Sequence, residues 1–121
     1  MPAPEDTTPL FALDAVVFDT ETTGLDPARA RLVEVGAVRI AQGRLVEAPL
    51  LQRLANPGEP MPAAAEAVHG IGDAELAGAP PAVQVIDELV AAAGSLVVVG
   101  HTIGFDLAVI RAERARAGLP A

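Results

Sequence analysis

Two acidic residues, Asp19 and Glu21, stand two positions apart where an apolar run gives way to threonines and a glycine. If that run is a strand, both carboxylates project from the same face, because side chains alternate along a strand. Like charges this close are unfavourable unless one carboxylate takes a proton or a cation joins them. Carboxylate oxygens are the ligands that Mg²⁺ and Mn²⁺ prefer, so the pattern predicts a divalent-metal site. The alternative is that one acid caps the next turn while its neighbour is solvated.

A third acid, Asp106, comes at the start of a predicted helix that follows the short apolar run of residues 96–100. Side chains at this position reach the carboxyl edge of a sheet. If this strand and the strand before Asp19 are parallel neighbours, the three carboxylates converge at one edge. Taken alone, Asp106 is better explained as a helix cap.

Three apolar segments separated by short polar turns predict an antiparallel meander in the first half of the chain. They cover residues 15–20, 32–40 and 45–54, and Gln42-Gly43 is typical of a hairpin turn. Pro49 cannot donate a ladder hydrogen bond, so the third strand is expected at an edge or with a bulge.

Helical patterns follow in the second half. A short helix is predicted over residues 62–68, and an amphipathic helix is predicted to begin at Pro81 and end at Gly94. The apolar run of residues 96–100 is typical of a strand in the middle of a sheet that is covered on both faces.

The last predicted helix places Ile103, Leu107 and Ile110 on one face. Three arginines lie near its end, where cations interact favourably with the helix dipole: Arg111, Arg114 and Arg116. That structural role is favoured over a phosphate-binding patch.

The totals predict one soluble, cytoplasmic domain with no membrane association. The chain has 121 residues, no cysteine and a formal net charge of −8, and no run reaches the roughly twenty apolar residues that span a bilayer. Residues 1–13 are expected to be a flexible segment and residues 14–121 a partial α/β domain. The acidic balance argues against long-range attraction to duplex DNA but allows a short nucleic-acid end held by metal ions.

Residues 18–25 (FDTETTGL) resemble the first motif of the DEDD (DnaQ-like, proofreading-type) 3′-5′ exonucleases. Residues 101–106 resemble the second motif, and residues 68–71 resemble the segment between them. The resemblance extends over about residues 14–118. It implies a ribonuclease H-like mixed sheet, with a three-strand antiparallel meander plus a parallel strand, flanked by helices. It also implies two bound divalent cations, Mg²⁺ or Mn²⁺.

Carried over by motif, Asp19, Glu21 and Asp106 would be catalytic metal ligands, with Asp19 bridging the two ions. The remaining motif residues would bind the substrate: Thr20, Thr22, Thr23, Gly24, Leu25, His69 and Phe105. Core packing is an equal alternative for Leu25 and Phe105. For His69 the alternative is a helix-end histidine bonded to backbone, and His101 is expected to be structural.

The sequence departs from the family in two places. Thr102 stands where the family usually has Asn, which affects a supporting hydrogen bond. The family's third motif supplies a His as general base and an Asp five residues later, whereas the histidines here, His69 and His101, both precede Asp106. The chain is therefore expected to be a fragment of a longer exonuclease that lacks the C-terminal part of the fold and is weakly active or inactive alone. A natural remnant and a chain that borrows the missing residues are the alternatives.

The parent protein is thus expected to remove nucleotides from 3′ ends by two-metal-ion hydrolysis. Its partners would be single-stranded DNA or RNA or short oligonucleotides, the nucleoside monophosphate product, and a polymerase or fused domain. A non-catalytic metal- or nucleotide-binding module of a polymerase-associated assembly is the alternative from another class. A haloacid-dehalogenase-type phosphatase is disfavoured, because its second acid is ordinarily Asp and the chain contains no Lys.

Overall fold

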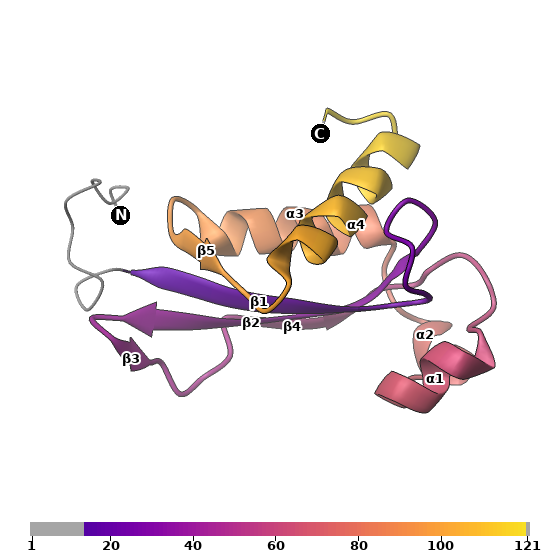
Figure 1. Cartoon of the computed structure of the whole chain (residues 1–121), viewed down its shortest axis with the longest axis horizontal. Helices are drawn as coiled ribbons and strands as arrows, with labels where there is room; N and C mark the ends of the chain where they lie inside the picture. Colours follow the sequence, from indigo (N-terminus) through magenta and orange to yellow (C-terminus); the bar gives the residue numbers. More distant parts are fainter. Residues whose placement is uncertain (1–13, 121) are drawn as a thin grey trace.

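The acidic strand is an interior strand of a mixed sheet. The computed structural model of the chain describes residues 14–120, and the sheet order is β3-β2-β1-β5, with β4 also pairing with β2 (Figure 1). The strands are β1 (Ala15–Thr22), β2 (Leu32–Ala41), β3 (Arg44–Leu45), β4 (Leu51–Leu54) and β5 (Val97–Val99). Strand β1 pairs antiparallel with β2 and parallel with β5. The predicted meander with one parallel strand is confirmed.

The turn between β2 and β3 is the predicted two-residue hairpin. Gln42 and Gly43 both have positive φ angles, 52° and 77°, and the flanking Ala41 and Arg44 are paired. Positive φ at both central residues matches the turn to the right-handed twist of the strands. The predicted third strand is divided into β3 and β4, with Pro49 in the gap between them, because proline has no N–H to donate to the ladder.

Strand β5 corrects one prediction. Its three valines were expected in the middle of a sheet covered on both faces, but within residues 14–120 β5 is an edge strand that pairs only with β1. Val98 and Val99 remain 42% and 44% exposed. The continuous apolar run therefore predicted a strand correctly. It did not predict the position of that strand in the sheet.

Within residues 14–120 four helices accompany the sheet, and the predicted boundaries of three of them are close to those observed. They are α1 (Ala63–His69), α2 (Asp73–Leu76), α3 (Ala82–Ala93) and α4 (Ile103–Arg116). Helix α3 follows Pro81 and is capped by Gly94, and α1 is capped by Gly70, whose φ of 74° is left-handed. Helices α3 and α4 cover one side of the sheet, whereas α1 and α2 lie at the far end of it (Figure 1).

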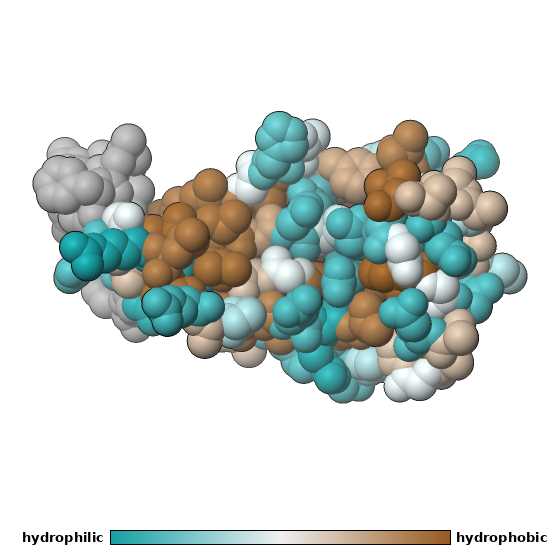
Figure 2. Space-filling view, turned by 90° about the horizontal axis from the view of Figure 1, so that it is seen from below, coloured by the Kyte–Doolittle hydropathy of each residue, from teal (hydrophilic) through white to brown (hydrophobic). Residues whose placement is uncertain are grey.

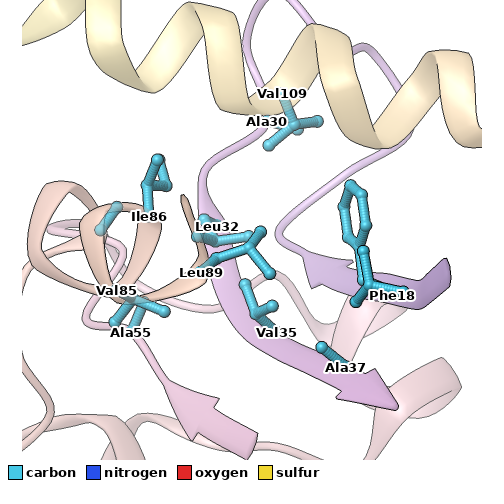
Figure 3. Close-up of a cluster of buried hydrophobic side chains, with 12 residues drawn as sticks. Phe18, Ala30, Leu32, Val35, Ala37, Ala55, Val85, Ile86, Leu89 and Val109 are labelled. Carbon is cyan, nitrogen blue, oxygen red and sulfur yellow. The ribbon is translucent and has the colours of Figure 1, made fainter. Parts of the chain in front are cut away.

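The main core lies between the sheet and helices α3 and α4 (Figure 3). Val85, Ile86 and Leu89 on one face of α3 are buried in it together with Phe18 and Val35 from the sheet. A smaller buried cluster of Val33, Met61, Ile71 and Leu76 holds the α1–α2 segment against β2. Burial of these apolar side chains fixes the pair α3 and α4, and the pair α1 and α2, relative to the sheet.

Helix α4 buries a different set of residues from the predicted apolar one. Its buried positions are Asp106, Val109 and Glu113, while the predicted Ile103, Leu107 and Ile110 are partly buried and pack against the main core. Two of the three buried side chains are acidic, and buried acids require partners that sequence periodicity does not reveal.

The side of the sheet away from α3 and α4 is partly open. Hydrophobic side chains gather at its β3 end, where Leu45 and Val46 are exposed (Figure 2). No helix within residues 14–120 combines the length and apolar character needed to cross a membrane. The predicted flexible segment, residues 1–13, lies outside the described residues.

Candidate active site

Strand β1 separates its acids from its threonines. Thr20 and Thr22 are buried on the helix-covered side, whereas Asp19 is exposed and Glu21 is partly exposed on the other side. This is the alternation that the strand geometry predicts. The two carboxylates therefore share one open face at the end of a strand whose backbone is fixed by β2.

Asp106 reaches β1 from the first turn of α4. Its Oδ1 accepts hydrogen bonds from the backbone N–H of Thr20 at 3.1 Å and from the Thr20 hydroxyl. Thr20 lies between Asp19 and Glu21 in the sequence, so Asp106 is attached to the residue that separates these two acids. The parallel pairing of β1 and β5 makes this possible, because the chain leaves β5 at the edge where Asp19 and Glu21 lie.

The electrostatic environment favours protonation of two of these acids. Burial, and then the charge of Asp19, raise the pKa of Glu21 above its ordinary value, while His69 lowers it. Burial also raises the pKa of Asp106, and the nearby charge of Asp19 adds to this, although the hydrogen bonds from Thr20 oppose the change. An added cation would relieve both the mutual repulsion and the lost hydration of these carboxylates.

Glu34 is a further acid at this site that the sequence interpretation missed. It lies directly opposite Glu21 in the β1–β2 register, and its charge also raises the pKa of Glu21. Like charges in directly opposed strand positions are destabilising. The available signal was a lone Glu among the alternating apolar residues of β2, but only the register places it beside Glu21.

The donor set of this edge fits a hard divalent cation. Asp19, Glu21 and Asp106 offer carboxylate oxygens, the ligand type that Mg²⁺ and Mn²⁺ take. Among residues 14–120, however, no three His, Cys, Asp or Glu side chains are already grouped as a ready metal site. The hydrogen bonds from Thr20 direct Oδ1 of Asp106 toward β1.

A pocket of about 410 Å³ opens beside the acids. Its lining comes from β1, the loop after it, α1 and α4: Thr20, Glu21, Thr22, Thr23, Gly24, Leu25, Pro62, Ala64, Ala65, Val68, His69 and Phe105. All seven residues named as substrate-binding candidates are in this lining. The other α1 residues of the lining, Ala64, Ala65 and Val68, were missed, since a short alanine-rich helix carries no signal that distinguishes a pocket wall from a surface.

Two side chains of this pocket are apolar and largely exposed. Leu25 is 94% exposed and Val68 is 84% exposed, so core packing does not explain either residue. Phe105 is partly buried, lines the pocket and also packs against the main core. The pocket is therefore mostly apolar, with Glu21 at its polar side.

Hydroxyls of the pocket are already engaged. The Thr22 hydroxyl donates to the carbonyl oxygen of Gly24 at 2.7 Å, and the Thr23 hydroxyl donates to Glu59 at 3.0 Å. Both bonds shape the turn after β1. A ligand in the pocket would meet threonine oxygens that can still accept a hydrogen bond.

His69 has a structural role as well as a place in the pocket lining. Its Nδ1 accepts the N–H of Ile71 at 3.1 Å, and its Nε2 lies 3.2 Å from the carbonyl oxygen of Thr22. Because Nδ1 is an acceptor, the ring proton is on Nε2 and donates to Thr22. This agrees with the predicted alternative of a helix-end histidine bonded to backbone, and it fixes α1 against β1.

The turn that leads into Asp106 is tightly constrained. A Cβ on Gly100 would lie 2.9 Å from the carbonyl oxygen of Phe18, so only glycine fits there without displacement. Thr102 has a left-handed backbone, with φ 55° and ψ 41°, and its side chain makes no capping bond to α4. A β-branched residue is unfavourable in this conformation, which asparagine adopts more readily.

Sequence comparisons match this arrangement to known proteins. A family model described as an exonuclease (RNase_T) matches residues 16–119. The chain is 47% identical over 105 residues to a DNA polymerase III subunit epsilon-like protein of Rhodobacter capsulatus. The match covers 86% of this chain and only 15% of that relative, so the chain spans a small part of the relative's length.

Solved structures give the same fold. Exonuclease I without ligand superposes with a TM-score of 0.77 at 18% identity, over 89% of this chain and 26% of the other. Exonuclease X in complex with 5′ overhanging duplex DNA gives a TM-score of 0.68 at 33% identity, over 78% of this chain and 52% of the other. The predicted ribonuclease H-like exonuclease fold is confirmed.

Proposed function

The chain belongs to the DnaQ-like, DEDD 3′-5′ exonuclease family, and we propose that it provides the acidic edge and nucleotide pocket of a 3′-5′ exonuclease. The substrate would be the 3′ end of single-stranded DNA or RNA, or a short oligonucleotide, and the product a nucleoside monophosphate. The reaction is hydrolysis of the terminal phosphodiester bond. Because the chain spans 15% of the Rhodobacter relative, the activity of a whole protein and its association with a polymerase are part of the proposal.

One observation carries the proposal: the apolar pocket and the acids share an edge. Glu21 belongs to the pocket lining, and Asp106 is attached to Thr20 of the same lining. A terminal nucleotide seated in a pocket of about 410 Å³ would place its phosphodiester next to these carboxylates. Pocket and acids would then act on the two ends of one nucleotide.

Each part of the site has a task in this proposal. Leu25, Val68 and Phe105 supply apolar surface for the base and sugar and exclude water from one side of the nucleotide. Asp19, Glu21 and Asp106 are the proposed cation ligands. When bound there, two divalent cations would supply activation of water and stabilisation of the charge that develops on the leaving oxygen.

The histidines of the described chain do not offer a ready general base. Both ring nitrogens of His69 are engaged with backbone groups, and His101 lies in an exposed turn before α4. Loss of a positioned acid or base typically slows a reaction about 10² to 10⁴-fold. We therefore expect slow hydrolysis by this 121-residue chain alone.

The test combines metal binding with nucleotide release. The chain is incubated with a single-stranded oligonucleotide and Mn²⁺, next to an Asp19→Ala variant, and mononucleotides are separated over hours. The melting temperature of both proteins is measured with and without Mn²⁺, since a ligand that binds only the native state raises it. We expect a Mn²⁺-dependent shift and slow mononucleotide release in the wild type, and loss of both in Asp19→Ala.

The outcomes separate the parts of this proposal. Absence of both the Mn²⁺ shift and mononucleotide release would contradict it. Rapid release that depends on Asp19 would support the nuclease and contradict only the expectation of slow turnover. Cleavage in the interior of the oligonucleotide, without mononucleotides, would contradict the 3′-5′ direction.

A second candidate is a module that binds metal or nucleotide without turnover, in a polymerase-associated assembly. The observation that favours it is that neither histidine of residues 14–120 is placed as a general base, since both ring nitrogens of His69 contact backbone groups and His101 lies in an exposed turn. A Mn²⁺-dependent thermal shift together with undetectable hydrolysis at long incubation would support this module over the nuclease.

A further inference from the structure

A buried ion-pair network joins the end of α4 to the loop that follows the acidic strand. The Glu113 side chain is only 1% exposed, and its Oε1 accepts hydrogen bonds from Arg31 Nε and, at 2.6 Å, from Arg116 Nη1. Its Oε2 lies 3.4 Å from Arg31 Nη2. An isolated buried carboxylate is costly, so Glu113 depends on these two guanidinium groups.

Glu113 and Asp106 lie on the same face of α4. Seven residues correspond to nearly two helical turns, and these two acids with Val109 are the buried residues of the helix. Asp106 contacts β1 through Thr20, and Glu113 contacts the loop through Arg31. Helix α4 is thus attached at one end to the acidic strand and at the other to the loop that leaves it.

The loop of residues 23–31 is closed by its own ends. The N–H of Thr23 donates to the carbonyl oxygen of Arg31 at 3.0 Å, and the N–H of Arg31 donates to the Thr23 hydroxyl at 2.9 Å. Arg116 adds a bond to the carbonyl oxygen of Ala28 at 2.9 Å. Where this loop contacts α4, Ala30 lies beside Val109 in the main core (Figure 3).

This loop carries one wall of the pocket. Thr23, Gly24 and Leu25 line it, and Leu25 has almost no other contact to hold it, being 94% exposed. Besides the Thr22 and Thr23 hydroxyl bonds that shape the turn, the contacts at Arg31 hold these residues in position relative to Glu21. Glu113 is the group that holds Arg31 and Arg116 together.

We propose that Glu113 is a positioning residue: through Arg31 and Arg116 it holds the loop of residues 23–31, and with it the Leu25 wall of the pocket, beside the acidic edge. The identity of the ligand in this proposal rests on the proposed function. The restraint of the loop by Glu113 does not. Glu113 lies about two helical turns from Asp106 and does not line the pocket beside the acids.

Loop restraint is measured by amide hydrogen exchange on the full chain. The Thr23 and Ala30 amides report the loop, and amides of β2 report global stability. In Glu113→Gln, which keeps the shape but loses the charge, we expect exchange of the loop amides to accelerate at least about tenfold more than exchange of the β2 amides, which absorbs the loss of global stability. Glu88→Gln is the matched control, because Glu88 forms a half-exposed pair with Arg53 away from the loop.

Nucleotide binding provides the readout that a merely stabilising role would not change. Affinity for thymidine 5′-monophosphate is measured by calorimetry in the presence of Mn²⁺, with Mn²⁺ alone as a separate titration. We expect Glu113→Gln to weaken nucleotide binding about tenfold and to leave Mn²⁺ binding within about twofold of the wild type. Glu113→Asp, which keeps the charge on a shorter stem, should recover part of the nucleotide affinity.

The two measurements together test the proposed role of Glu113. Unchanged loop exchange in Glu113→Gln overturns the proposal, and so does a loosened loop with unchanged nucleotide affinity. If Glu113→Gln does not fold, Arg116→Met gives the same exchange test while leaving the Arg31 pair intact. If the wild-type chain binds neither Mn²⁺ nor nucleotide, the proposed function fails, and loop exchange alone decides the role of Glu113.

Discussion

Helix α4 carries two buried carboxylates whose surroundings are opposite. Asp106, at its start, accepts hydrogen bonds from the neutral donors of Thr20, and burial raises its pKa. Glu113, near its end, is paired with two arginines, and its hydrogen bond raises the pKa of Arg31. The same helix face thus holds one acid whose charge is compensated within the protein and one whose charge is not.

This difference indicates what each acid is for. A buried charge with protein partners contributes to structure, because its own neighbours satisfy it. A buried acid with neutral partners, next to Asp19 and Glu21, leaves negative charge that an external cation would compensate. The comparison therefore separates the structural end of α4 from the proposed metal-binding end.

The largest effect is expected from removing the compensated acid. Glu113→Leu leaves Arg31 and Arg116 without their buried partner, and breaking such a pair costs about 3 to 5 kcal/mol. Both arginines are partly exposed and can regain water, so we expect a loss near the lower value, measured by urea unfolding. Glu88→Leu, which breaks a half-exposed pair, should cost about 1 kcal/mol or less. Equal losses in the two variants would contradict the comparison.

Removing the charge of the uncompensated acid, Asp106, should instead increase stability. Asp106→Asn keeps an oxygen that can accept the Thr20 bonds and removes a buried charge, so we expect a gain of about 1 kcal/mol at pH 7 in urea unfolding without metal. The same variant should lose the stabilisation that Mn²⁺ gives the wild type. A destabilised variant would show that the Asp106 charge is needed for the fold.

The advantage of Asp106→Asn should depend on pH. The folded-state pKa of Asp106 lies above its ordinary value of 3.8, so the folded wild type takes up this proton at a higher pH than the unfolded chain does. The stability linked to that proton is fully present below 3.8 and is lost as pH rises through the raised pKa. The difference between variant and wild type should thus increase from acid to neutral pH, which unfolding curves from pH 4 to 8 will test. A constant difference would contradict the raised pKa.

The smallest effect is expected at the turn before Asp106. Thr102→Asn replaces a β-branched residue at φ 55° by one that tolerates the left-handed region, and we expect a gain of about 0.5 to 1 kcal/mol in melting experiments. Gln42→Asn, at φ 52° in the hairpin, is the control and should gain less, because Gln is not branched at Cβ. An equal gain at both positions would show that branching at Cβ does not matter there.

Much of the fold could be predicted from local patterns. The alternation in β1 and β2, the Gln42-Gly43 hairpin and the helix that begins after Pro81 all depend on residues near one another in the sequence. The edge position of β5 could not be predicted, because an apolar run specifies burial of its side chains and not which strands flank it. The burial of Asp106 and Glu113 in α4 was not predicted for a related reason, since their partners are distant in sequence.

The site divides in the same way. The sequence by itself determined that Asp19 and Glu21 share a face, because strand geometry requires it, and the motif resemblance indicated the family that the comparisons show. Tertiary structure alone decided that Asp106 binds Thr20, that Glu34 faces Glu21 and that Glu113 pairs with Arg31 at the end of the loop. These contacts join segments up to 86 residues apart, and only strand pairing and helix packing bring such segments together.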